Sequence, residues 1–290
     1  HADMIELEDG RWYMVSLGKR NDLDGDANMG RETYLMPMQW EPTIVKWEQV
    51  SEDRWEPLRY LFPVVAPLTG KVERFTPLPY ADKPQYINNT VVDDFLDENL
   101  DLRWTFVRVP EDKTYSLSEN PGFLRLYSKP GIIQDRKRFS LVGFRQKESD
   151  FEFEVKMNFS PEKDKVESGI IHYQKEWNYL TNTVTKVKKK YYLEQNLKEK
   201  SKEIVTLKKT ILKGYDGNII LKVKSKKDKY DFYYSLNNGS SFIYFTSMDA
   251  IKILDRNYTG ALLGLYTTSN GKVTQDYADY DWIRYRDYLR

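Results

Sequence analysis

Short runs of alternating apolar and polar residues recur along the chain from residue 91 onward, and this alternation most constrains the fold. The clearest runs are 151–157, 169–173, 220–224 and 232–235. Asn237-Asn238-Gly239 then separates the last run from another at 242–245, as in a β-hairpin. Alternation with period two at this spacing is typical of an antiparallel β-sandwich, and no long amphipathic helix accompanies it. We therefore expect one large sandwich over residues 91–290.

The beginning of the chain predicts a β-hairpin. Residues 4–7 and 12–17 are largely apolar, and Glu8-Asp9-Gly10 lies between them as a turn. Residues 1–60 also hold four of the seven Trp, at positions 12, 40, 47 and 55. A segment this small buries little by itself, so we expect it to need partner strands that it does not supply.

Residues 61–90 carry five prolines. Proline cannot donate to the interior of a β-ladder, so this stretch is expected to be an extended connector or an edge segment. The predicted organisation is therefore an N-terminal β segment at 1–60, a connector at 61–90, and a sandwich at 91–290.

Composition excludes several classes of function. The chain has 45 Lys and Arg against 44 Asp and Glu, a net charge of +1, which argues against a nucleic-acid partner. It has no Cys and two His, at positions 1 and 172, which argues against thiolate zinc sites, multi-histidine metal centres and a Ser-His-Asp triad. The sequence has no run of 18 apolar residues, which a membrane-spanning helix would need, so no membrane partner is expected.

One stretch, 184–229, is rich in lysine, with 15 Lys against five acidic residues. It could be a polyanion-binding face. The simpler interpretation is the solvated side of several strands, because Lys alternates with apolar residues there, and Lys on an outward face also blocks edge-to-edge pairing. The sequence favours the simpler interpretation.

Two groups of motifs resemble a known enzyme family, glycoside hydrolase family 43. The first group resembles the end of the catalytic domain in its β-xylosidase/α-L-arabinofuranosidase branch: His1-Ala2-Asp3, Gly10-Arg11-Trp12-Tyr13 and Gly30-Arg31-Glu32-Thr33. The second group resembles the concanavalin A-like domain appended to those enzymes: Asp93-Asp94-Phe95, Leu100-Asp101-Leu102-Arg103-Trp104, Pro121-Gly122-Phe123-Leu124-Arg125-Leu126, Tyr258-Thr259-Gly260-Ala261 and Ala278-Asp279-Tyr280-Asp281-Trp282. The order and spacing of these motifs cover nearly the whole chain.

The resemblance implies an all-β chain: a concanavalin A-like antiparallel β-sandwich preceded by the last strands of an incomplete five-bladed β-propeller. In that family an Asp base, a Glu acid and a second Asp that tunes the acid line the propeller axis. All three precede the His-Ala-Asp motif, so no catalytic residue is assigned in this chain. The chain alone is expected not to hydrolyse glycosides at an enzymatic rate, because inverting hydrolysis needs both carboxyl groups.

The resemblance also implies three sugar-binding residues. Arg31 would point into the sugar pocket and hydrogen-bond the substrate. The alternative interpretation of Arg31 is a surface arginine at the start of a strand. His1 would help to organise the pocket or a metal ion, and its alternative is a frayed terminus. Tyr258 would lend an aromatic ring to the pocket rim, and its alternative is an ordinary core aromatic residue.

No cofactor is required by this interpretation, although a structural calcium ion is one option. Asp94 and Asp281 lie near the two ends of the sandwich sequence, whose first and last strands are often neighbours, and carboxylates suit Ca²⁺. The alternative, which we favour, is two solvated aspartates. His172 is expected to be a hydrogen-bonded core residue. Glycosylation sequons at Asn88, Asn158, Asn238 and Asn257 carry little weight.

The sequence therefore supports two functions. The first is the C-terminal part of a glycoside hydrolase that removes xylosyl or arabinosyl residues from hemicellulose by an inverting acid/base mechanism. Its partners would be a xylo- or arabino-oligosaccharide and, if the chain is split, the missing propeller on a separate polypeptide. We expect secretion or a periplasmic location ahead of a cytoplasmic one. The alternative is a non-catalytic carbohydrate-binding sandwich, which predicts a row of exposed Trp or Tyr on one sheet face, whereas the first function predicts that Tyr258 faces a pocket completed by Arg31.

Overall fold

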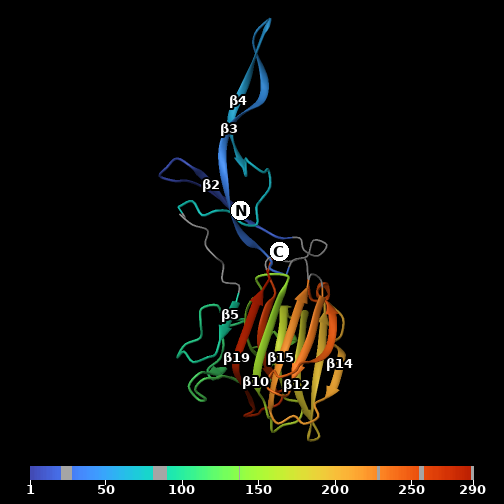
Figure 1. Ribbon diagram of the computed structural model, residues 1–290. Coiled ribbons are helices and arrows are strands. Elements are labelled where there is room, and N and C mark those ends of the chain that lie inside the picture. The colour runs from blue at the N-terminus through green and yellow to red at the C-terminus, as the bar shows by residue number, and fades with distance from the viewer. Residues whose placement is uncertain (21–27, 81–89, 137, 227–228, 255–257, 289–290) are drawn as a thin grey trace. The chain divides into compact units, whose positions relative to one another are not determined.

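The computed structural model describes residues 1–20, 28–80, 90–136, 138–226, 229–254 and 258–288 (Figure 1). Its regular structure is β throughout, apart from the 3-10 turns η1 (Ile133–Asp135) and η2 (Ala250–Ile253). The prediction of an all-β chain is therefore confirmed. None of the helices in these ranges is long and apolar enough to span a membrane. The chain divides into two compact units, residues 1–19 with 31–87, and residues 20–30 with 88–290.

The first unit is a four-stranded antiparallel sheet in the order β1-β2-β3-β4. Its strands are β1 (Ala2–Glu6), β2 (Trp12–Gly18), β3 (Glu32–Ser51) and β4 (Arg54–Val65). The predicted hairpin is confirmed: β1 pairs with β2, and Gly10 adopts a φ of 81° in the turn between them. Strand β4 lies at the sheet edge and carries Pro57 and Pro63, as the edge rule for proline requires. It continues to Val65 and so includes the first five residues of the expected connector, 61–65. Residues 81–89 of that connector lie outside the described residues.

Much apolar surface of this unit stays exposed. Strand β2 pairs with β3 only from Glu32 to Met38, so the rest of β3 and β4 forms a two-stranded ribbon. Trp12 and Trp40 pack edge to face, with ring centroids 5.4 Å apart. Trp47 and Trp55 on the ribbon are 57% and 56% exposed. A two-stranded ribbon is marginally stable in water, which fits the expectation that this segment needs further strands.

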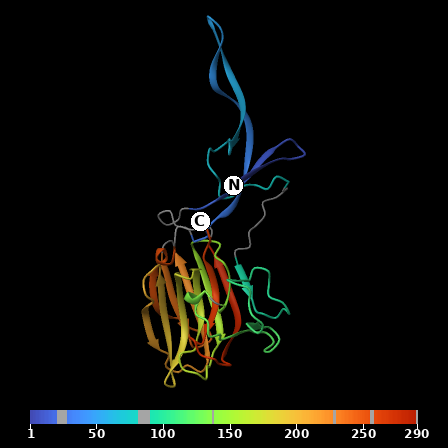
Figure 2. The same ribbon diagram turned by 180° about the vertical axis from the view of Figure 1, so that it is seen from behind.

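The second unit is a β-sandwich of an eight-stranded and a seven-stranded antiparallel sheet (Figures 1 and 2). The eight-stranded sheet runs β17-β16-β15-β10-β19-β8-β7, and β5 pairs with β19. Its strands are β5 (Thr90–Asp93), β7 (Tyr115–Ser116), β8 (Leu124–Tyr127), β10 (Phe151–Asn158), β15 (Asn218–Lys226), β16 (Lys229–Ser235), β17 (Ile243–Asp249) and β19 (Tyr277–Asp287). The pairing of β5 with β19 confirms that the first and last strands are neighbours.

The seven-stranded sheet runs β14-β13-β12-β11-β18-β9-β6. Its strands are β6 (Thr105–Phe106), β9 (Ser140–Arg145), β11 (Glu167–Lys175), β12 (Asn178–Val187), β13 (Lys190–Glu199), β14 (Val205–Ile211) and β18 (Leu262–Thr268). Strand β14 is the exposed edge and carries Lys208 and Lys209, which oppose edge pairing with another chain.

Alternation along the strands builds the core between the two sheets. On β10, Phe151, Phe153, Val155 and Met157 are fully buried, whereas the residues between them are only partly buried. They join a cluster that includes Ile170 of β11 and Leu265 of β18 from the facing sheet. The predicted period-two runs are therefore the strands that form the core.

Candidate functional site

Residues 28–30 belong to the sandwich unit although they precede Arg31 in sequence. The backbone N–H of Ala261 donates to the carbonyl of Asn28 at 2.6 Å, and Gly30 forms an antiparallel bridge with Thr259. We call this contact between residues 28–30 and 259–261 the junction. It uses the Tyr258-Thr259-Gly260-Ala261 motif that the sequence singled out.

Two glycines allow the backbones of the junction to meet. Gly30 has a φ of 69°, and a Cβ on it would lie 2.2 Å from the backbone nitrogen of Gly260. A Cβ on Gly260 would lie 2.3 Å from the carbonyl oxygen of Met29. Neither position tolerates a side chain without displacement of backbone, so the glycine just before Arg31 is needed for close approach as well as for its positive φ.

The side chain of Asn28 fixes the junction to the core of the sandwich. Asn28 is fully buried, and its Oδ1 accepts a hydrogen bond from the hydroxyl of Tyr230 at 3.2 Å. Burial raises the pKa of Tyr230, so the phenol stays protonated and remains a donor. The Tyr230 ring packs on His172, with centroids 4.9 Å apart. The junction is thus held from the interior of the sandwich.

Further hydrogen bonds hold residues 259–261 and Arg20 to the sandwich. Gln174 Nε2 donates to the carbonyl of Thr259 at 3.3 Å, and the backbone N–H of Gln146 donates to the carbonyl of Ala261 at 3.1 Å. Arg20 also bonds to the sandwich: it donates to Glu148 Oε2 at 2.7 Å and to the carbonyl of Lys147 at 3.0 Å. Arg20 and residues 28–30 are therefore each bonded to the sandwich.

The predicted sugar-binding residues flank this junction in sequence. Tyr258 directly precedes the bridged Thr259 and is 66% exposed, so it is not the core aromatic residue of the alternative interpretation. Arg31 directly follows Gly30, is exposed, and is the first residue of the other unit to follow the loop. His1 is exposed next to strand β1, and its carbonyl accepts a hydrogen bond from the N–H of Leu17 at 3.4 Å.

His172 lies in the core, as predicted, but one of its two ring nitrogens lacks the hydrogen bond that was expected. Its side chain is 1% exposed, and Nε2 has no hydrogen-bond partner among the described residues. Burial lowers the pKa of His172 to about 3, so the imidazole is neutral at ordinary pH. Packing against Tyr230 and Phe232 explains its position better than a polar contact does.

The aspartates considered for calcium have other partners. Asp281 pairs with Lys156, whose Nζ lies 2.7 Å from Oδ2, and Asp94 Oδ1 accepts from the N–H of Leu96 at 3.4 Å. Within the described ranges no group of three or more His, Cys, Asp or Glu could hold a metal ion. Lys156 thus pairs with one of the two aspartates, and the calcium site stays a prediction.

One face of the sandwich bears on the alternative function. The outer face of the seven-stranded sheet carries Tyr173, Tyr179 and Tyr266, which are 6%, 3% and 2% exposed. They cluster with Ile133 of η1 and with Phe139, which pack against them. These three rings therefore do not form the row of exposed aromatic residues that a binding module requires.

Some lysines of the stretch 184–229 are paired with carboxylates on neighbouring strands. Lys222 lies 2.6 Å from Glu154 and 3.1 Å from Glu152, and Lys209 lies 2.5 Å from Glu194. These contacts join neighbouring strands across the sheet surfaces. They support the interpretation of 184–229 as the solvated side of several strands rather than a polyanion-binding face.

Sequence reasoning missed the polar residues that fix the junction, chiefly Asn28, Gln174 and Tyr230. Asn28 gave no signal of its own, because a single Asn in a polar loop is ordinary. The glycines at 30 and 260 were the available signal, since each stands inside one of the two motifs that the resemblance uses.

Comparison with known proteins places the chain in a family. Residues 92–286 match the beta xylosidase C-terminal concanavalin A-like domain, and the chain belongs to this family. It is 29% identical over 289 residues to a non-reducing end alpha-L-arabinofuranosidase, BoGH43B, of Bacteroides ovatus, covering 99% of this chain and 50% of that protein. It is 30% identical over 291 residues to a xylosidase/arabinosidase of Butyrivibrio fibrisolvens, covering 98% and 51%. The chain spans about half the length of the curated relatives it matches.

Solved structures agree with this placement. The GH43B structure of the Bacteroides ovatus xyloglucan locus aligns with a TM-score of 0.83 at 26% identity, over 99% of this chain and 53% of that one. The GH43 protein BlXynB of Bacillus licheniformis aligns with a TM-score of 0.79 at 27% identity, over the same shares. The resemblance to the C-terminal portion of family 43 enzymes and the concanavalin A-like fold are both confirmed.

Proposed function

We propose that the chain is the C-terminal, sugar-contacting part of a glycoside hydrolase that removes xylosyl or arabinosyl residues. The observation that carries the proposal is the bridge between Gly30 and Thr259. Arg31 follows Gly30 and Tyr258 precedes Thr259, so each is one residue away from the same backbone contact. The names of the relatives, xylosidases and arabinofuranosidases, support the choice of sugar.

The two residues suit complementary parts of a sugar. The guanidinium of Arg31 presents rigid, permanently charged donors to hydroxyl oxygens. The ring of Tyr258 offers an apolar face with a polar tip, which suits the C–H face of a pyranose or furanose. His1 would offer the sugar a further polar group.

The reaction needs groups outside this chain. An inverting glycosidase activates water with one carboxylate and protonates the leaving oxygen with another, which must keep a raised pKa. We propose that both belong to the propeller region that precedes residue 1, on the same polypeptide or on a separate one. The exposed tryptophans of the β3–β4 ribbon support this, because they lack the neighbours that a complete propeller would supply. Oligosaccharide substrates outside the cell favour a secreted or periplasmic location.

The test compares two arginine variants in the active protein that contains this chain. Arg31→Ala should raise KM and lower kcat/KM for an aryl β-xyloside or α-arabinofuranoside by about 10- to 100-fold, as loss of a charged hydrogen bond to substrate does. Arg59→Ala removes an exposed arginine from the ribbon and serves as the control, with kinetics close to wild type. Equal activity of the Arg31→Ala variant and wild type would contradict the proposal.

A further inference from the structure

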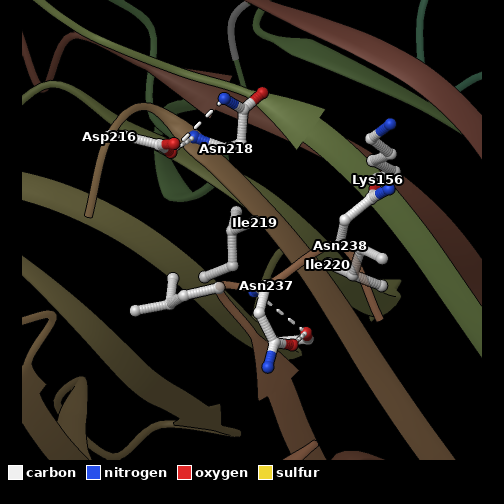
Figure 3. A pocket seen from close by; sticks show the side chains of 9 residues that line it. Lys156, Asp216, Asn218, Ile219, Ile220, Asn237 and Asn238 are labelled. Carbon is white, nitrogen blue, oxygen red and sulfur yellow. Dashed lines mark hydrogen bonds between the residues drawn. The ribbon is translucent and has the colours of Figure 1, made fainter. Parts of the chain in front are cut away.

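A polar pocket lies at the opposite end of β16 from Tyr230 and therefore away from the junction (Figure 3). It forms where β10 and β16 end and β15 begins, and its volume is about 420 Å³. Its lining includes three amide side chains, one carboxylate, one ammonium and an apolar floor: Asn218, Asn237, Asn238, Asp216, Lys156 and Ile220. This volume is within the range of small-molecule sites, ~300–1,000 Å³.

The lining matches the chemistry of vicinal hydroxyl groups. Each amide offers both a donor and acceptor, as a sugar hydroxyl does. Asp216 accepts from the backbone N–H of Asn218 at 2.9 Å, which lowers the pKa of Asp216 and keeps it a charged acceptor. Ile220 is 4% exposed beneath these groups and provides an apolar surface for C–H bonds.

The charges around the pocket favour a neutral ligand. Lys156 is engaged with Asp281, at 2.7 Å. Figure 3 shows Lys156 beside Asn238 on one side of the pocket, and Asp216 with Asn218 on another. An anionic ligand would meet the ionised Asp216 without an unengaged cation to offset it, so a phosphate or a uronate is disfavoured.

The polar groups are held in place before any ligand arrives. Asn237 Oδ1 accepts from Ser235 Oγ at 2.8 Å and from the N–H of Ser241 at 3.0 Å, while Asn237 Nδ2 donates to Ser241 Oγ at 2.8 Å. Asn158 Nδ2 donates to Asn218 Oδ1 at 3.1 Å. Asn238 makes no side-chain hydrogen bond to the described residues, so its amide is available. Such preorganisation lowers the entropy cost of binding.

A glycine borders the apolar floor. Gly239 has a φ of 84°, and a Cβ on it would lie 3.3 Å from Cδ1 of Ile220. Any side chain here would press on the floor of the pocket in addition to straining the backbone.

We propose that this pocket binds a neutral sugar unit, separately from Arg31 and Tyr258. The lining itself supports a neutral sugar, whereas the choice of a xylan-type sugar as the ligand rests on the function proposed above. The amides would bind hydroxyl groups, Asp216 would accept from a further hydroxyl, and Ile220 would contact the C–H face.

The test is an NMR titration of the whole 290-residue chain with xylobiose. Backbone amides of Asn218, Ile220 and Gly239 should shift with a Kd on the order of 1 mM, and glucuronate should bind more weakly. Asn238→Gly keeps the left-handed backbone that Asn238 adopts, at a φ of 53°, and should weaken binding about 5-fold through loss of the amide. Arg31→Ala should leave these shifts unchanged.

A pair of glycine variants separates blockage of the pocket from backbone strain. Gly239→Ala should abolish the shifts, whereas Gly271→Ala, at a φ of 85° with nothing within 4 Å of the new Cβ, should keep them. Absence of shifts at these amides up to about 50 mM xylobiose, or equal binding by the Asn238→Gly variant, would overturn the proposal.

Discussion

At the scale of single residues, the buried His172 and the partly buried Glu167 give the sandwich opposite responses to pH. His172 is neutral in the folded protein, because burial lowers its pKa from 6.5 to about 3. Glu167 of β11 has a pKa raised from 4.5 to about 7, chiefly by burial and secondly by the nearby charge of Glu194. On acidification the unfolded chain binds a proton at His172 at a higher pH than the folded chain does. At Glu167 the order is reversed, and the folded chain binds its proton at the higher pH.

For His172 the stabilising contribution is complete above pH 6.5 and is lost as the pH falls toward 3. His172→Phe keeps an aromatic ring against Tyr230 and removes this titration. We expect the free energy of unfolding of wild type to fall below that of the variant by up to about 1.4 kcal/mol for each pH unit below 6.5. Urea unfolding at several pH values measures this difference, and parallel pH profiles of the two proteins would count against it.

For Glu167 the sign is reversed. Its raised pKa means that ionisation costs stability as the pH rises from 4.5 to about 7, and the full cost is present above 7. Glu167→Gln keeps an acceptor for the hydroxyl of Thr183, which donates to Glu167 Oε2 at 3.3 Å. We expect the variant to be more stable than wild type by about 2 kcal/mol at pH 8 and to lose the difference at pH 4. A variant that is less stable at both pH values would refute this role.

At the scale of elements, the junction is the contact on which the proposed function depends. Gly30→Ala places a Cβ 2.2 Å from the backbone of Gly260 and strains a positive φ. We expect it to cost at least about 2 kcal/mol locally and to raise amide exchange of Ala261, whose N–H donates to Asn28. Gly70→Ala has a similar φ of 66° with nothing within 4 Å, and is the control for strain alone. Equal exchange at Ala261 in both variants would show that the close approach does not matter.

The sequence predicted five of the fifteen strands that the structure describes in the sandwich, but not the junction. Alternation located β10, β11, β15, β16 and β17, because each buries one face and its apolar residues must recur every second position. It could not show that residues 20–30 join the sandwich, since that depends on Asn28 meeting Tyr230 about 200 residues later, a long-range pairing of polar side chains with no local period. The resemblance named Arg31 and Tyr258, whereas only the structure showed which residues fix the backbone beside them.

At the scale of the whole molecule, the two units should differ in stability. The sandwich has a continuous core from both sheets, whereas the first unit leaves Trp47, Trp55 and Leu61 exposed. In the isolated chain we expect amides of 32–65 to exchange much faster than those of β10 and β11, because few buried apolar contacts oppose their opening. Strong protection throughout 32–65 would mean that this unit folds without further strands.

The central claim is that this chain supplies sugar contacts to a glycosidase whose acid and base lie on preceding residues. Its most direct test is hydrolysis of aryl β-xyloside and α-arabinofuranoside by the 290-residue chain alone and by the protein purified from its native source, with a denaturing intact-mass spectrum of each. We predict no turnover above background for the chain of 34.5 kDa, and activity in native fractions that also contain propeller-sized sequence, on the same or a second polypeptide. Turnover by the chain alone that Arg31→Ala abolishes would contradict the claim, because the acid and base would then lie within these residues.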